Sequence, residues 1–208
     1  MRRRTERFDT AAGGLVRASA LALGLLAGMP AAGAAEAACE FRGWSKDPDP
    51  AGLNLHATPA RTAAVVGRLP APRRDGDETF AVEVRVVAGR DGWLLVDRAE
   101  FADYGSAPAK TVFTGRGWVS GRMVGVSVQD ERVRRQPDAA AAIVDRPRAP
   151  EGGEAEILRL DRIVACRGRW IEVEGSFGEA GGVAARGAGR PTRGWVTGLC
   201  GNQVTTCP

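Results

Sequence analysis

The chain contains one short motif twice. Residues 116–121 read Arg-Gly-Trp-Val-Ser-Gly, and residues 193–198 read Arg-Gly-Trp-Val-Thr-Gly, 77 positions later. Upstream, Ala63–Val66 reappears as Ala141–Val144 at a spacing of 78. Motifs that recur in the same order, with one change of spacing from 78 to 77 residues, indicate a tandem duplication of a unit of about 75 residues. We therefore expect two similar folding units.

Short strand signals separated by glycine and proline lie between these motifs. Leu53–His56 alternates apolar and polar residues, Thr79–Val87 is rich in β-branched residues, and Trp93–Asp97 follows a Gly-Arg-Asp-Gly turn. No segment shows a sustained helical period. This pattern is typical of a small β-barrel or sandwich, so the sequence predicts an all-β fold.

Residues 1–34 have the features of an export signal. Several arginines precede the apolar run Ala18–Met29, and two candidate A-x-A cleavage sites follow within residues 32–37. The run is shorter than the roughly 20 residues that span a membrane. We therefore expect cleavage, not a stable membrane anchor, and a periplasmic or secreted mature protein.

The export signal carries most of the positive charge. Residues 1–34 hold five arginines against Glu6 and Asp9, so removing them lowers the formal net charge from +4 to +1. A nearly neutral mature chain lacks the concentrated positive charge of proteins that bind nucleic acid. We therefore expect no nucleic-acid partner.

Four cysteines follow the signal: Cys39, Cys166, Cys200 and Cys207. An even number of cysteines in an exported chain indicates two disulfide bonds. Cys39 precedes the first unit, whereas the other three lie in the second. If all four are paired, each of the three possible connectivities joins Cys39 to the second unit, and its partner stays open. We expect one compact two-lobed body.

The first unit contains four motifs in a recognisable order. Residues 52–59 read Gly-Leu-Asn-Leu-His-Ala-Thr-Pro, and three short motifs follow: Val65-Val66-Gly67, Asp91-Gly92-Trp93 and Gly117-Trp118-Val119. This order resembles the bacterial SH3-like domain family over residues 52–126 and, more loosely, over residues 130–200. The resemblance implies small five- or six-stranded barrels, and the usual role in this family is to bind cell-wall or protein ligands.

The predicted fold class is therefore all-β, with two small SH3-like β-barrels in tandem that disulfides stabilise. We divide the chain into a signal peptide at 1–34, a leading segment at 35–51, and SH3-like domains at 52–128 and 129–208, the second with a cysteine-containing C-terminal tail. A polar insertion, 99–115 in the first unit, lengthens the hairpin between the two tryptophans of each unit. Such a loop is a common place for specificity, and a longer hairpin without a ligand is the alternative.

The residues that carry chemistry are few. His56 is the single histidine, which excludes a metal site with two imidazoles and weakens every Ser-His or Cys-His arrangement. The acidic clusters within 75–78 and 151–156 show no ordered ligand spacing, so we interpret them as solvated loop charge. We expect no catalytic residue, no metal and no cofactor, and a hydrolase is the least favoured class.

The aromatic residues fall into two groups. Four tryptophans recur at equivalent strand positions, which favours a role in packing: Trp93, Trp118, Trp170 and Trp195. The candidate ligand-binding residues are Trp44, Phe101, Tyr104 and Phe177. Trp44 has no counterpart in the second unit and can help to form a groove, and we expect the other three to be exposed on the two long loops.

These observations favour a non-catalytic envelope protein that binds peptidoglycan or a partner protein. The long loops and the cleft between the barrels would carry the recognition. The alternative is a structural or regulatory subunit that modulates an envelope enzyme.

Overall fold

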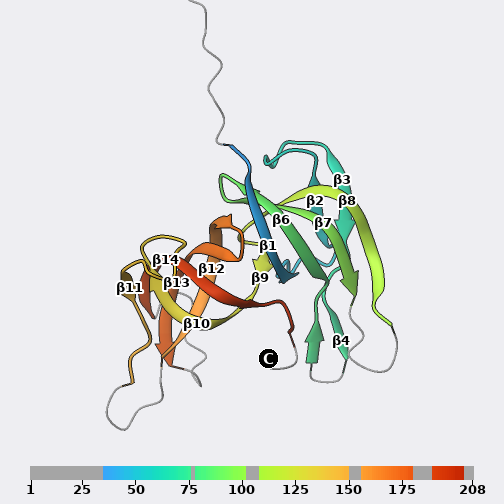
Figure 1. The fold of residues 1–208 in the computed structure, drawn as a ribbon. Coiled ribbons are helices and arrows are strands. Elements are labelled where there is room, and N and C mark those ends of the chain that lie inside the picture. The colour runs from blue at the N-terminus through green and yellow to red at the C-terminus, as the bar shows by residue number, and fades with distance from the viewer. Residues whose placement is uncertain (1–34, 76–77, 102–107, 150–155, 180–188, 204–208) are drawn as a thin grey trace, which may run out of the picture. The chain divides into compact units, whose positions relative to one another are not determined.

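Strands make up the regular structure of the protein (Figure 1). The computed structural model describes residues 35–75, 78–101, 108–149, 156–179 and 189–203. Within these ranges the chain forms strands and no helix, so the prediction of an all-β fold is confirmed. It follows that no helix of these residues is long and apolar enough to cross a membrane.

The larger sheet has seven strands in the order β3-β2-β8-β7-β6-β1-β9. Their bounds are Ala37–Ser45 (β1), Leu53–His56 (β2), Val65–Leu69 (β3), Glu83–Arg90 (β6), Trp93–Phe101 (β7), Lys110–Ser120 (β8) and Val124–Gly125 (β9). A small separate hairpin pairs Arg73–Asp75 (β4) with Glu78–Phe80 (β5). Strand twist lets a sheet of this size curl, and the fold contains such a curled half-barrel (Figure 1).

The smaller sheet has five strands in the order β11-β10-β14-β13-β12. Their bounds are Ser127–Arg134 (β10), Ile143–Asp145 (β11), Glu156–Arg167 (β12), Trp170–Glu179 (β13) and Arg190–Cys200 (β14). This order has the same form as β3-β2-β8-β7-β6 in the larger sheet, with β11 in the place of β3 and β12 in the place of β6.

Cross-strand pairing around the repeated tryptophans also has the same register in the two sheets. Leu95 on β7 lies opposite Trp118 on β8, and 77 residues later Glu172 lies opposite Trp195. The side-chain period of a strand is two, so a shift of one residue in either sheet would reverse the faces of a whole strand. The tryptophans of the repeated motif therefore occupy the same position in each sheet.

Close backbone contact explains the glycine of each Gly-Trp pair. A Cβ atom added to Gly117 would lie 2.7 Å from Leu55 Cβ, and one added to Gly194 would lie 2.6 Å from the carbonyl oxygen of Arg134. Real Cβ atoms do not approach other atoms this closely, so β2 and β10 leave no room for a side chain at these positions.

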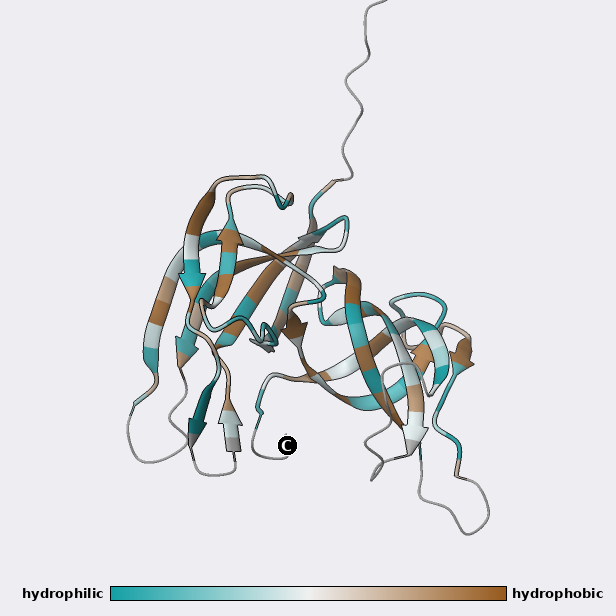
Figure 2. Ribbon diagram, turned by 180° about the vertical axis from the view of Figure 1, so that it is seen from behind, coloured by the Kyte–Doolittle hydropathy of each residue, from teal (hydrophilic) through white to brown (hydrophobic). Residues whose placement is uncertain are grey.

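One continuous apolar core contains side chains from both sheets. On β13, for example, Ile171, Val173 and Phe177 are buried at alternating positions. Figure 2 shows this alternation as brown and teal bands along the strands. The backbone also links the sheets, because the amide of Ile163 donates a hydrogen bond of 3.0 Å to the carbonyl of Gly121.

A disulfide joins the N-terminal strand to the smaller sheet. Cys39 on β1 is bonded to Cys166 on β12, which confirms the expectation that Cys39 is linked to the second unit. Backbone bonds flank this link, since Glu40 N donates to Gly168 O at 2.7 Å and Gly168 N donates to Ala38 O at 2.8 Å. Cys200 is also disulfide-bonded, and Cys207 lies outside the described residues. A disulfide is consistent with an oxidising extracellular compartment.

The expectation of a polar loop over 99–115 is wrong for its described part. There β7 continues to Phe101, and Glu100 on β7 lies opposite Thr111 on β8. The insertion therefore lengthens the two strands of a hairpin. The leading segment also has a larger role than expected, because β1 lies inside the seven-stranded sheet, between β6 and β9.

The Cys39–Cys166 bond closes a loop of 127 residues, so it strongly restricts the unfolded chain. We predict that replacing both cysteines by serine lowers the free energy of unfolding by about 2–5 kcal/mol. Urea denaturation of the two proteins measures this difference, and the wild-type protein in reductant should shift in the same direction. Equal midpoints for variant and wild type would contradict the prediction.

Arg162 donates two hydrogen bonds to Glu174, at 2.6 and 2.7 Å, and these hold the pKa of Glu174 below its ordinary value. A lowered folded-state pKa stabilises the fold above the unfolded pKa, and this stabilisation is lost as the pH falls through the folded pKa. We predict that Glu174→Gln shows a smaller loss of stability than the wild type between about pH 6 and about pH 3. Denaturation curves across that range measure it, and Arg162→Gln should behave like Glu174→Gln.

Candidate functional site around Trp44

Trp44 lies near the end of β1, opposite Glu83 on β6 and Gly125 on β9. Its side chain is half-buried. A Cβ atom added to Gly125 would lie 2.5 Å from Trp44 Nε1 and 2.6 Å from Trp44 Cε2, so the indole rests directly on the backbone of β9. This contact holds the ring in place and leaves part of it exposed.

A hollow of about 550 Å³ lies on one side of the indole. Its walls combine Trp44, prolines and a few polar side chains: Ser45, Lys46, Asp47, Pro48, Pro50, Ala71, Pro72, Thr79, Ala81 and Gln203. Apolar walls with a small number of placed polar groups are typical of ligand-binding sites.

The far end of the chain completes the wall of this hollow. Gln203 Nε2 donates a hydrogen bond to Ala81 O, and Ala81 N donates one to Gln203 Oε1, both at 2.9 Å across 122 residues of sequence. Nearby, a Cβ atom added to Gly201 would lie 2.5 Å from Arg42 Cβ. The C-terminal segment therefore packs against the larger sheet.

Ser45 lies in the wall of the same hollow. Its residue is 2% exposed, and its buried Oγ atom has no hydrogen-bond partner. A buried hydroxyl without a partner costs about 1–3 kcal/mol. The polar groups that face a ligand in this hollow are therefore those of its less buried side chains, such as Asp47 and Thr79.

A second hollow of about 350 Å³ also has the indole in its wall. Its walls come from β1, β9, β10, β12 and the residues next to them: Trp44, Lys46, Gly125, Val126, Ser127, Val128, Glu131, Ile157, Leu158 and Leu160. Two hydrogen bonds shape it. Lys46 Nζ donates to Leu160 O at 3.3 Å, and Leu158 N donates to Glu131 Oε1 at 2.9 Å.

Trp44 and Lys46 belong to the walls of both hollows. A compact ligand that fills one hollow contacts only the part of the indole that lines it. An extended ligand can lie against the indole and reach into both. The geometry therefore suits a linear molecule or an extended segment of a larger one.

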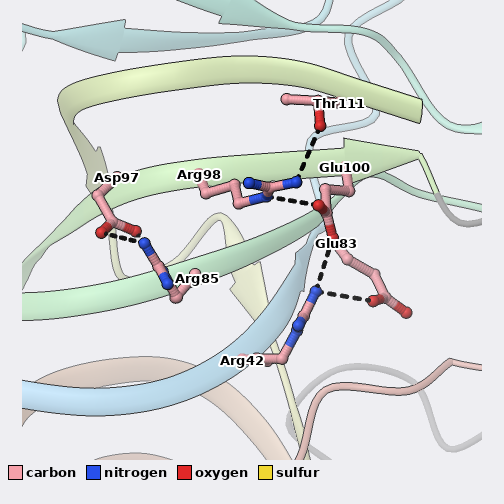
Figure 3. Close-up of polar contacts among 7 residues, drawn as sticks. All are labelled: Arg42, Glu83, Arg85, Asp97, Arg98, Glu100 and Thr111. Atoms are coloured by element: carbon pink, nitrogen blue, oxygen red, sulfur yellow. Dashed lines mark hydrogen bonds and ion pairs between the residues drawn. The ribbon is translucent and has the colours of Figure 1, made fainter. Parts of the chain in front are cut away.

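Charged side chains on the neighbouring strands neutralise one another. Arg42 Nη2 lies 2.9 Å from a carboxylate oxygen of Glu100 and 3.9 Å from one of Glu83 (Figure 3). Arg98 bonds to Glu100 and to Thr111. The hydrogen bond from Arg98 is the main cause that lowers the pKa of Glu100. This network stabilises the strands beside Trp44 and keeps Glu100 ionised, which suits a carboxylate that supports the fold.

The four candidate residues have different outcomes. Trp44 lines the two hollows, and Tyr104 lies outside the described residues. Phe101 is half-buried at the end of β7, with the guanidinium of Arg73 4.8 Å from its ring centroid. The expectation that Phe177 is exposed is wrong, since it is 1% exposed. The reason is that its position on β13 has the same parity as the buried side chains of that strand.

His56 has a structural role. Its Nδ1 atom lies 3.0 Å from the carbonyl oxygen of Ala63, and its ring contacts Trp93 edge-on at 5.7 Å. At the equivalent place in the smaller sheet, Arg134 Nη1 donates to Ala141 O at 2.9 Å. Both side chains thus close the turn that follows their strand. Among the described residues, no three His, Cys, Asp or Glu side chains are grouped to hold a metal.

The sequence pointed to Trp44 as a binding residue but not to the residues that form the hollows around it. The prolines of the leading segment indicated an extended conformation, although not that they would form a wall. Gln203 carries no signal at all, because its bonds to Ala81 join residues far apart in the sequence. No protein-family model, curated protein or solved structure matches this chain.

We predict that Gly125→Ala lowers the free energy of unfolding by about 1–3 kcal/mol, because the new methyl group would displace the indole of Trp44. Gly178→Ala is the matched control, since a Cβ atom there meets nothing closer than 4.0 Å. Chemical denaturation of both variants measures the difference. Equal effects of the two substitutions would show that the indole does not rest on Gly125 as described.

Proposed function

We propose that the protein is a non-catalytic binding module, built from two SH3-like barrels in tandem, that holds an extended ligand across Trp44. The observation that carries this proposal is that one half-buried indole lines two adjacent hollows. The ligand is a peptidoglycan chain or an extended segment of an envelope protein, and peptidoglycan is the one we test first.

Several repeated contacts support two related units. The sheets share their strand order and the register of Trp118 and Trp195. A two-bond ion pair also recurs at a spacing of 77: Arg85 with Asp97, at 2.8 and 2.7 Å, corresponds to Arg162 with Glu174. Figure 3 shows the first of these pairs. Independent units would have no reason to share such a side-chain pair at the same sequence spacing.

The chemistry of the two hollows suits a polymer with both apolar and polar surfaces. An indole face packs against the apolar face of a sugar ring or against a peptide. Asp47 and Thr79 supply polar groups to the larger hollow, and Lys46 carries a positive charge beside both hollows. Peptidoglycan presents sugar rings, amides and carboxylates along one chain. The predicted export signal and the disulfide agree with a periplasmic or secreted protein that meets this polymer.

We predict that mature wild-type protein sediments with purified cell-wall sacculi and that Trp44→Ala reduces the bound fraction at least about tenfold, because hot-spot aromatic residues contribute about 2 kcal/mol or more. Trp170→Ala is the matched control. Trp170 is also half-buried, but it lines neither hollow, so its removal should leave sedimentation unchanged.

If the wild type stays in the supernatant, direct wall binding is wrong. A photo-cross-linking amino acid at position 44 then tests for a protein ligand in cells. A cross-linked envelope enzyme would support the regulatory alternative. Equal sedimentation of wild type and Trp44→Ala would show that the wall binds elsewhere on the protein.

A further inference from the structure

Four large apolar side chains are exposed among the described residues: Val65 (50%), Val66 (48%), Ile143 (44%) and Val144 (45%). They lie on β3 and β11, and the two pairs are 78 residues apart, which is the spacing of the surrounding repeat. The same two positions are therefore exposed and apolar in both sheets. The two stretches differ elsewhere in sequence, yet both keep an exposed apolar pair at these positions. One shared role would explain both pairs.

β3 and β11 are the first strands of their sheets. In the described part of the chain, β3 pairs only with β2, and β11 pairs only with β10. The outer edge of each strand therefore presents backbone N–H and C=O groups that no neighbouring strand satisfies. Successive side chains of a strand point to opposite faces, so each edge is apolar on both of its faces.

Charged side chains and proline are the common means by which proteins prevent an edge strand from accepting another strand. On these two edges such residues lie only toward the end of each strand, as Arg68 on β3 and Asp145 on β11. The first part of each strand, Val65–Gly67 and Ile143–Val144, carries no charge and no proline. The opposite edge of the smaller sheet is protected, because β12 carries several charged residues: Glu156, Arg159, Asp161, Arg162 and Arg167.

The charge around the two edges is positive. Residues 50–74 contain four arginines and no carboxylate. Residues 132–148 contain five arginines, one of which, Arg132, is paired with Asp130, against Asp138 and Asp145. Asp145 is also bound to Arg190. Pairing of one such edge with the edge of a second copy would bring like charges together. An acidic partner instead gains from the opposite charge.

We propose that β3 and β11 each accept an extended segment of another protein, apolar at successive positions and acidic at its ends, as an added β-strand. The free backbone groups specify a strand, the exposed pairs specify apolar side chains on both faces, and the arginines specify acidic ends. The module thus has two strand-accepting edges of the same kind, apart from the hollows beside Trp44.

The probe is a labelled ten-residue peptide of six successive valines and isoleucines with two glutamates at each end. Fluorescence anisotropy and calorimetry with the mature protein should show saturable binding at two sites per chain. Val66→Lys and Val144→Lys should each abolish one site, and the double variant should weaken binding at least tenfold. Gln129→Lys is the matched control, because it adds the same charge at an exposed position on an inner strand.

A second peptide with the same side chains and with all of its central amides N-methylated tests the backbone. It should not bind, because it cannot form the strand hydrogen bonds. Binding of this peptide, or unchanged binding to the double lysine variant, would overturn the proposal. Trp44→Ala should still bind the unmodified peptide at both edges, so failure of wall binding and failure of edge pairing are separate results. Self-association that Val66→Lys abolishes would identify a second copy as the occupant and overturn the proposal.

Discussion

The covalent link between Cys39 and Cys166 is the constraint on which the arrangement of this protein depends. It joins β1 of the larger sheet to β12 of the smaller one, and backbone bonds to Gly168 reinforce it. Units of about 75 residues bury little apolar surface by themselves. Cross-linking and the shared core thus stabilise both sheets together.

The candidate site depends on the same strand. β1 carries Cys39 near its beginning and Trp44 near its end, so the bond that joins it to β12 also fixes the strand that holds the indole. Residues of β12 and Trp44 of β1 thus lie in the walls of one hollow. Gln203, in the C-terminal segment, lies in the wall of the other hollow. A rigid wall of this kind loses little conformational freedom when a ligand binds, so the entropy cost of binding is small.

The sequence allowed the class of fold and part of the site to be predicted. Alternation in Leu53–His56 and the Gly-Arg-Asp-Gly turn before Trp93 act over a few residues, so these local signals are readable without a structure. Trp44 was recognisable because, unlike the other four tryptophans, it has no counterpart 77 or 78 residues away in the sequence. Phe177 was misplaced because the insertion that contains it was interpreted as a loop. If that segment is taken as a strand, the period of two already assigns Phe177 to the core.

By itself, the sequence determined the all-β class, some strands and turns such as Leu53–His56, the glycine before each repeated tryptophan and, provided that all four cysteines are paired, the linkage of Cys39 to the second half of the chain. These features follow from local patterns and from counting. The tertiary structure decided that β1 lies inside a sheet, that Ser45 is buried without a partner, and that Gln203 closes a hollow by bonding to Ala81. Such contacts join residues as many as 122 positions apart, and no local propensity encodes which distant backbone a side chain will meet.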